Sequence, residues 1–293
     1  CSDLLASGAT VISAQAIITL PDVASNLQEE LLVQTLAGIE SALIEQGAHL
    51  IGGHTLESRS EAPVPPSMGI EVGLSVNGSI LAEYSSWQKG GLQLGDVLLL
   101  SRPIGMGVLF AAAMRGEASS EQYDEVINQI SKSQHLLIEK LQSLQKSNEN
   151  SSVVHACTDI TGFGLLGHLG EMISASKRSL KSRGLNDLLR VILHLEKLPV
   201  FSGAIPLIEA GFFSTLAPAN RASLSMLQSP QDGRPSVETS LGGIKKGSLR
   251  HQAFLELLVD PQTCGPLLIA CERTIADELV SEGCWSEIGE VLD

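Results

Sequence analysis

The sequence predicts a protein of mixed α and β structure that folds as two domains, and three observations support this. The chain has 293 residues, about twice the length of a typical single domain. Segments with the apolar alternation of strands are interleaved with segments whose apolar residues recur at helical spacing. Between residues 85 and 91 the composition turns polar and glycine-bearing. We therefore expect an N-terminal domain over residues 1–86 and a C-terminal domain over residues 87–293.

The first domain is expected to hold two helices and three strands. The start of the chain has the pattern of a helix that ends at Gly8. Strands are expected over residues 9–20, 48–57 and 69–76, and a long helix over residues 25–46. The second strand is expected to lead into a turn at Gly52-Gly53, and the third to end at the turn pair Asn77-Gly78. Between these strands, Pro63, Pro65 and Pro66 predict a loop.

The second domain continues the alternation of strands and helices. Strands are expected over residues 97–100, 267–271 and 288–292, and in the extended run that ends at residue 159. Helices are expected over residues 108–114, 119–146, 204–211, 255–259 and 274–282. Residues 188–195 fit a strand or a helix, and residues 177–183 fit a basic loop or a helix end. A polar turn is expected over residues 217–221 and a loop over residues 232–247.

The charge of the chain excludes some classes of partner. Lysine and arginine total 19 against 33 acidic residues, giving a formal net charge of -14. This argues against nucleic acid or an anionic membrane as the main partner. The sequence has no apolar stretch of transmembrane length and its start lacks the layout of a signal peptide, so we expect a cytoplasmic protein. An anionic substrate would need a metal or a local cation, for which Arg102 and Arg221 are the best candidates.

The cysteines predict reduced thiols rather than a metal site or a disulfide framework. There are five, and no two of them form a CxxC pair: Cys1, Cys157, Cys264, Cys271 and Cys284. A zinc site is therefore not expected. Because the chain begins with cysteine, inside what reads as a helix, we expect it to be the tail of a longer protein.

The stretch from Ala156 to Leu169 is the strongest candidate for chemistry. An extended run ends at Asp159, bends through glycines and enters a helix. Such an edge exposes backbone N–H groups beside one carboxylate, and it can hold phosphate or a metal bound to phosphate. A carboxylate beside a phosphate is tolerated only when a cation lies between them, so Asp159 favours the metal-bound alternative.

Other interpretations of these residues stay open. Gly162 to Gly167 match the GxGxxG pattern of dinucleotide-binding folds, but the acid expected about 20 residues later, at the end of the next strand, is missing. The glycines could also serve only to pack a helix on a strand. Asp3 alone would be a surface acid, and the residues from Gly52 to Thr55 could form a plain turn or approach a ligand closely. The residues from Asp260 to Thr263 read as structural, with one of them capping a turn.

Five blocks of sequence, taken in order, resemble one enzyme family. They are residues 2–8 (SDLLASG), 52–55 (GGHT), 95–107 (GDVLLLSRPIGMG), 156–169 (ACTDITGFGLLGHL) and 260–265 (DPQTCG). Together they are similar to selenophosphate synthetase, also called selenide, water dikinase. The fourth block is highly specific; the others are shared with aminoimidazole ribonucleotide synthetase and its wider superfamily.

The resemblance implies a fold, a reaction and a set of site residues. The fold is α+β, with a partial N-terminal domain and a complete C-terminal α/β domain whose mixed sheet is flanked by helices. N-terminal domains would pair sheet to sheet in a homodimer, with ATP in the cleft between domains. Selenide, ATP and water would give selenophosphate, AMP and phosphate, with Mg²⁺ and a monovalent cation such as K⁺. Asp3 and Asp159 match the metal ligands, and Asp3, Gly53, His54 and Thr55 match the ATP site.

Departures from the family keep two alternatives open. The family's N-terminal segment, with its reactive Cys or selenocysteine and its lysine, has no counterpart here, and no cysteine is assigned the role of nucleophile by motif. Cys264 stands where relatives often carry serine, and Pro266 replaces a glycine. We expect a chain that folds and dimerises but does not catalyse alone. The alternatives are an ADP-forming ligase or kinase of the same superfamily, and a non-catalytic dimerisation or nucleotide-binding module.

Overall fold

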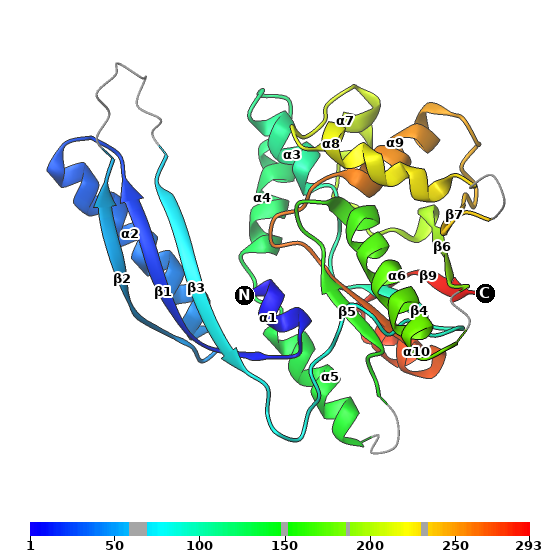
Figure 1. Ribbon diagram of the computed structural model, residues 1–293. Coiled ribbons are helices and arrows are strands. Elements are labelled where there is room, and N and C mark those ends of the chain that lie inside the picture. Colours follow the sequence, from blue (N-terminus) through cyan, green and yellow to red (C-terminus); the bar gives the residue numbers. More distant parts are fainter. Residues whose placement is uncertain (59–68, 148–151, 186–187, 230–233) are drawn as a thin grey trace.

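The computed structural model describes residues 1–58, 69–147, 152–185, 188–229 and 234–293, which form two sheets with their helices (Figure 1). A three-stranded sheet has the order β2-β1-β3. A six-stranded sheet has the order β5-β8-β4-β9-β6-β7. The strands are β1 (Thr10–Leu20), β2 (His49–Glu57), β3 (Glu71–Ser79), β4 (Val97–Leu100), β5 (Ala156–Asp159), β6 (Arg190–His194), β7 (Val237–Ser240), β8 (Leu267–Cys271) and β9 (Ser286–Leu292).

Helices precede, connect and follow these strands. The α-helices are α1 (Ser2–Ala6), α2 (Ser25–Ile44), α3 (Met106–Ala113), α4 (Ser120–Ile130), α5 (His135–Ser147), α6 (Gly164–Ser182), α7 (Ala204–Glu209), α8 (Ala217–Asn220), α9 (Leu249–Val259) and α10 (Arg273–Ser281). Short 3₁₀ helices cover Leu195–Lys197 and Arg221–Leu227. Within the described residues, no helix is both long and apolar enough to cross a membrane.

The three-stranded sheet is packed on one face only. Strand β1 lies in the middle, parallel to β2 and antiparallel to β3. Its inward residues Ala16, Ile18 and Leu20 are buried together with apolar side chains of α2 such as Leu32 and Leu36. The residues between them on β1 face away from α2 and are largely exposed. The sheet therefore leaves one face without a covering layer in this chain.

The six-stranded sheet is covered on both faces. On β4, Leu98 and Leu100 join a core cluster with apolar residues of α3, α6, α7 and α9. The alternate residues Val97 and Leu99 join a second cluster with residues of α1, α5 and α10. All four are buried, as expected for a strand with helices on both sides. Figure 1 shows the three-stranded sheet projecting from this helix-covered body.

Helix α1 belongs in space to the body although it opens the chain. Leu5 and Ala6 are buried in the cluster that covers one face of the six-stranded sheet. The helix ends as predicted: Gly8 has a left-handed φ of 75°, and Ala9 N donates to Leu4 O at 3.0 Å. This position brings residues at the very start of the chain to the strand β5, which carries Asp159.

Several expected elements are present and five expectations are wrong. The single helix expected over residues 119–146 is two helices, α4 and α5, because the helical conformation is interrupted at residues 131–134. There the Arg102 guanidinium donates a hydrogen bond to Lys132 O. The buried side chain of Gln134 donates another to Gly265 O, at 3.0 Å. The polar turn expected at 217–221 is the short helix α8, and the loop expected at 232–247 contains strand β7.

The two turns expected in the first domain are also wrong. Strand β2 continues through Gly52-Gly53, and β3 continues through Asn77-Gly78. Both glycines that lie against β1 mark close backbone approach: a Cβ on Gly53 would lie 1.9 Å from Ala16 O, and one on Gly78 would lie 2.6 Å from Thr10 O. Strand β1 has a register irregularity beside each of them. The glycines permit irregular pairing within the sheet, not reversal of the chain.

The remaining undecided segments have clear outcomes where the structure describes them. Residues 188–195 contain strand β6 rather than a helix, and the basic segment 177–183 lies in the last turns of α6 and just beyond. The proline-rich loop at Pro63–Pro66 lies outside the described residues.

Candidate functional site

Asp159 lies at the carboxyl end of β5, an edge strand of the six-stranded sheet, and its residue is 5% exposed. Its Oδ2 accepts a 2.7 Å hydrogen bond from Ser2 Oγ. Ser2 is the first residue of α1, so the start of the chain and the end of β5 meet at this carboxylate. A buried carboxylate with a neutral partner keeps acceptor capacity for a cation.

The turn after Asp159 is built by backbone approach and by one buried histidine. Gly164 has a left-handed φ of 71°, and a Cβ there would lie 2.8 Å from the carbonyl carbon of Val259 in α9. His168 Nε2 lies 3.1 Å from Thr161 Oγ1, and burial lowers the pKa of this imidazole. Gly164 therefore permits close packing of α6 on the end of helix α9, whereas the structural interpretation of the motif expected a helix packed on a strand. Helix α6 starts without a side-chain cap, and its first N–H, that of Gly164, donates to Thr161 O at 3.1 Å.

Asp3 follows Ser2 in the sequence but makes no hydrogen bond to Asp159 among the described residues. It is exposed in the first turn of α1, one residue after Ser2. In the part of the chain that the structure describes, no group of three or more His, Cys, Asp and Glu side chains could hold a metal ion. Two carboxylates suit Mg²⁺ when phosphate oxygens and water complete the coordination, because Mg²⁺ commonly takes only one or two protein carboxylates. The assignment of Asp3 and Asp159 to a metal held jointly with a nucleotide stays a prediction.

Gly53, His54 and Thr55 do not form a ligand-binding turn. They lie in β2, where consecutive side chains point to opposite faces. His54 is the register partner of Ile17 and shares its face, which is turned away from α2, whereas Thr55 is the partner of Ile18 on the packed face. No hydrogen bond joins His54 or Thr55 to Asp3 or Asp159 among the described residues. Their assignment to an ATP site stays a prediction.

Neither arginine singled out in the sequence is an unpaired phosphate ligand. Arg102 is buried and donates to the carbonyls of Cys264, at 3.0 Å, and Lys132. Arg221 pairs with Glu256, with Nε 3.0 Å from both carboxylate oxygens, and lies over the Phe213 ring. Arg102 instead joins the turn at Cys264 to the break between α4 and α5.

Arg102 also lines a cavity of about 250 Å³. Its wall includes Ser2, whose hydroxyl binds Asp159, and two exposed cysteines, Cys1 and Cys264. Cys264 adopts a left-handed φ of 49°, rare for a residue with a side chain.

The buried cysteines are unsuited to nucleophilic chemistry. Burial raises the pKa of Cys157 far above its usual range, with a smaller contribution from nearby Asp159, and raises that of Cys271 to about 12. Both thiols therefore stay protonated at neutral pH. Cys1, Cys264 and Cys284 are exposed.

Asp260 has the capping role that the sequence predicted for its segment. Its Oδ2 accepts from Gly107 N, in the first turn of α3, and from Gln262 Nε2, each at 3.0 Å. Burial raises the pKa of this carboxyl to about 7, against the opposing effect of its hydrogen bonds. The segment ties α9 to α3 and does not contact Asp159 by any hydrogen bond of the described residues.

Comparison with protein families shows which family this chain belongs to. The model of the AIR synthase related protein C-terminal domain matches residues 93–293, and that of the N-terminal domain matches residues 1–74. Selenide, water dikinase of Trichlorobacter lovleyi is 31% identical over 292 residues, which cover 99% of this chain and 70% of the relative. The chain belongs to the selenide, water dikinase family of AIR synthase related proteins. The family resemblance drawn from the five sequence blocks is thereby confirmed.

Other selenide, water dikinases match over the same extent. Those of Clostridioides difficile and Bdellovibrio bacteriovorus are 31% and 28% identical, over 96% and 95% of this chain and 67% of each relative. The chain thus spans about two thirds of the length of these relatives. Among solved structures, thiamine-monophosphate kinase from Stenotrophomonas maltophilia aligns with a TM-score of 0.64 at 16% identity, covering 100% of this chain and 72% of that one. E. coli HypE, a hydrogenase maturation protein, aligns at 0.63 and 17%, covering 100% and 70%. These two show the α+β fold.

Two site features were missed from the sequence. Ser2 was noticed only as part of a block, although its hydroxyl makes the one side-chain hydrogen bond to Asp159 among the described residues. Its position next to Asp3 was the available signal. Arg102 was expected to bind phosphate, and only the folded chain reveals that its guanidinium binds backbone carbonyls far along the sequence.

Proposed function

We propose that this chain serves selenophosphate synthesis, binding Mg–ATP at the carboxyl end of β5. In the family's reaction, selenide and water receive the two phosphoryl groups, so that ATP gives selenophosphate, orthophosphate and AMP. The observation that carries the proposal is the buried carboxylate of Asp159, held by Ser2 immediately before the uncapped start of α6. Relatives at about 30% identity are named selenide, water dikinase, and the proposed substrate, selenide, is taken from that name.

Asp159 and Asp3 would hold magnesium, which supplies charge neutralisation of the polyphosphate when bound. The protein's own contribution is positional. Ser2 fixes one oxygen of Asp159, and the N–H groups at the start of α6 favour a phosphate at the same edge. Burial of Asp159 strengthens its interaction with a cation relative to that of an exposed acid.

The test is magnesium-dependent ATP binding by the full chain. Asp159→Asn keeps an acceptor oxygen for Ser2 but removes the charge, and is expected to weaken Mg–ATP binding about tenfold or more. Asp277→Asn changes an exposed acid of α10 and should leave the affinity unchanged. Equal affinity of Asp159→Asn and the unmodified chain would remove Asp159 from the site.

Product analysis separates the alternatives. In a reaction with selenide, selenide-dependent AMP and orthophosphate would identify dikinase turnover, and would overturn the expectation that this chain does not catalyse alone. ADP as the final product would favour a ligase or kinase of the superfamily. Binding of ATP without turnover would fit both a dikinase chain that does not catalyse alone and the nucleotide-binding module.

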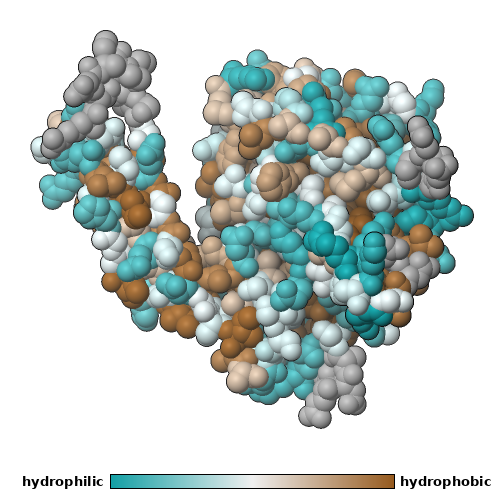
Figure 2. All heavy atoms as spheres, in the orientation of Figure 1, coloured by the Kyte–Doolittle hydropathy of each residue, from teal (hydrophilic) through white to brown (hydrophobic). Residues whose placement is uncertain are grey.

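We also propose that two copies pair through the open face of the three-stranded sheet. Ile12, Ile17, Ile51 and Leu56 are 44 to 60% exposed on β1 and β2. Ile17 alternates with the residues packed on α2, and Ile51 follows Leu50, which packs toward α2, so both lie on the open face. Figure 2 shows hydrophobic side chains exposed along the projecting sheet. An apolar sheet face of this kind is stabilised by a second layer, which another copy would supply.

A further inference from the structure

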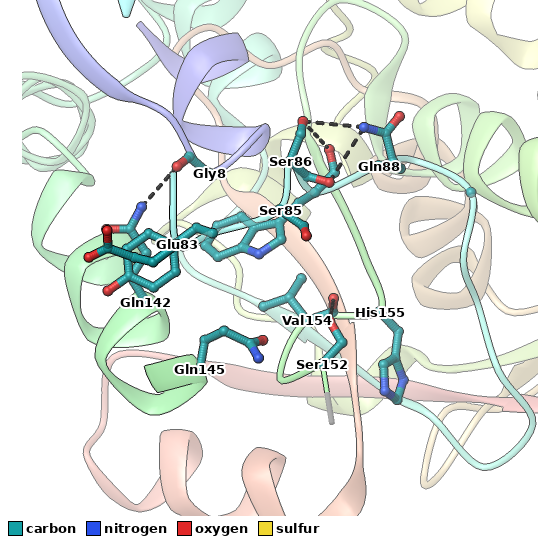
Figure 3. A pocket seen from close by; sticks show the side chains of 13 residues that line it. Gly8, Glu83, Ser85, Ser86, Gln88, Gln142, Gln145, Ser152, Val154 and His155 are labelled. Atoms are coloured by element: carbon teal, nitrogen blue, oxygen red, sulfur yellow. Dashed lines mark hydrogen bonds between the residues drawn. The ribbon is translucent and has the colours of Figure 1, made fainter. Parts of the chain in front are cut away.

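A second cavity lies where the linker between the two sheets crosses the body of the protein (Figure 3). Its volume is about 410 Å³, which is in the range of small-molecule sites. The walls come from the end of α1 at Gly8, the linker segment 83–90, helix α5 and the residues just before β5. Four residues of extended chain, about 13 Å at 3.3 Å per residue, separate its wall residue His155 from Asp159. This linker cavity also shares no lining residue with the cavity that Ser2 lines, so the two are separate cavities.

The polar groups of the linker cavity are mostly uncharged. They are the hydroxyls of Ser85, Ser86 and Ser152 and the carboxamides of Gln88, Gln142 and Gln145. No lysine or arginine is among its described lining residues, and the carboxylate there, Glu83, has Lys146 Nζ at 3.9 Å. His155 is paired with buried Asp96, Nδ1 to Oδ1 at 2.7 Å. A lining with no unpaired cation disfavours phosphate and other anions, and favours a neutral ligand rich in hydrogen-bonding groups.

Aromatic side chains complete the linker cavity. Tyr84 and Trp87 line it, although the whole chain has only two tyrosines and two tryptophans. Aromatic faces beside polar side chains suit a planar heterocycle, since its ring can stack on them while hydroxyl groups offer single hydrogen bonds to its edge.

The wall is held in place without a ligand. Gln142 Nε2 donates to Gly8 O at 2.8 Å, and Gln145 Oε1 accepts from Val153 N at 2.8 Å. Trp87 N donates to Ser7 O at 3.0 Å, and the indole lies so near Gly8 that a Cβ there would be 3.1 Å from it. In Figure 3 the Gln145 side chain points toward Val154 and Ser152 across the cavity. A preformed wall loses little conformational freedom on binding.

We propose that the linker cavity binds a purine nucleoside in its neutral form. The ligand would contact α1, the linker and α5 together, and so would bind across the junction of the two domains. This inference does not depend on the proposed dikinase activity, because none of its residues belongs to the Asp159 site.

The test is equilibrium dialysis of radiolabelled adenosine against the full chain, with saturating Mg–ATP present. Tyr84→Ala and Trp87→Ala are expected to weaken adenosine binding about tenfold or more, because each removes a stacking surface. Tyr123→Ala is the matched control, since Tyr123 lies on α4 against Phe110, outside the cavity. Unchanged binding in both cavity variants, or absence of binding to the unmodified chain, would overturn the proposal.

Fluorescence supplies a second readout. Trp285→Phe removes a buried tryptophan and leaves Trp87 as the only tryptophan of the chain. Adenosine should then quench the Trp87 emission, with saturation over the same concentrations at which dialysis detects binding. Displacement of adenosine by Mg–ATP would assign the binding to the ATP site instead. Displacement of adenosine by glucose would mean that the linker cavity binds a sugar rather than a nucleoside, and would overturn the proposal. Failure of Mg–ATP binding with retained adenosine binding would count against the dikinase proposal alone.

Discussion

Ser2 Oγ donates a 2.7 Å hydrogen bond to Oδ2 of Asp159, and this bond joins two residues that are 157 positions apart. It couples the first turn of α1 to the last residue of β5, so the order of the candidate metal site depends on the docking of α1. Leu5 and Ala6 hold that helix in the core beside the six-stranded sheet. The geometry of the site is therefore a tertiary property of the chain.

Ser2→Ala should destabilise the fold by about 1 to 3 kcal/mol, because it leaves a buried carboxylate without this donor. Urea unfolding at pH 7 measures the change. Ser7→Ala is the control, since its hydroxyl bonds only to Leu4 O within the same helix end. Mg–ATP affinity should fall less than in Asp159→Asn, because serine carries no charge. Equal stability of both serine variants would contradict the coupling.

Gly53 and Gly52 offer a test of the close approach between β2 and β1. Both have positive φ, 155° and 144°, but a Cβ on Gly53 would meet Ala16 O at 1.9 Å whereas one on Gly52 would meet nothing within 4 Å. Gly53→Ala should therefore be less stable than Gly52→Ala by at least about 2 kcal/mol in urea unfolding. Similar losses in the two variants would assign the cost to backbone conformation alone.

The sequence predicted best where burial alone determines structure. The all-apolar runs at Val97–Leu100 and Leu267–Cys271 are central buried strands, because a strand with helices on both faces needs no polar alternation. The stretch from Ala156 to Leu169 was likewise correctly predicted as strand, turn and helix, because its apolar run, its glycines and its helical spacing follow one another along the chain. These patterns are local, and so they can be seen along the chain.

Features that depend on distant partners could not be predicted. The break between α4 and α5 is stabilised by Arg102 and Gln134, whose partners lie in other elements, while the helical periodicity continues across it. The strand at Gly52-Gly53 looked like a turn because glycine pairs usually mark one, and the neighbouring Ala16 carbonyl is visible only after pairing. The domain boundary and the assignments of Asp3, Gly53, His54 and Thr55 stay predictions.

Pairing through the open sheet face predicts a dimer that one charge can disrupt. Ile17→Lys or Ile51→Lys should shift the chain to a monomer in sedimentation velocity, because a lysine would have to be buried in an interface to which each isoleucine contributes about 1.5 to 3 kcal/mol. Val33→Lys is the control, since Val33 is as exposed but lies on α2. A monomeric unmodified chain, or a dimer that survives both sheet substitutions, would exclude this interface.

The raised pKa of the Asp260 carboxyl predicts that its contribution to stability falls as pH rises. Burial raises the pKa of its carboxyl in the folded state to about 7, from 3.8. The folded state thus holds the proton more tightly than the unfolded state, so this group's contribution is complete below pH 4 and is lost as pH rises toward 7. The loss reaches about 1.4 kcal/mol per pH unit at most.

Asp260→Asn is neutral at every pH and keeps an oxygen to accept from Gly107 N, so the variant should lack this loss. The measurement is the difference in free energy of unfolding between variant and parent from pH 4.5 to 7.5. Subtracting the parent cancels the other titrating groups, including His155, whose pKa is raised by its hydrogen bond to Asp96 and whose stabilising effect fades only above pH 6.5. The free energy of unfolding of the variant should rise relative to that of the parent as pH rises through this range. A difference that stays constant with pH would mean that Asp260 does not titrate there.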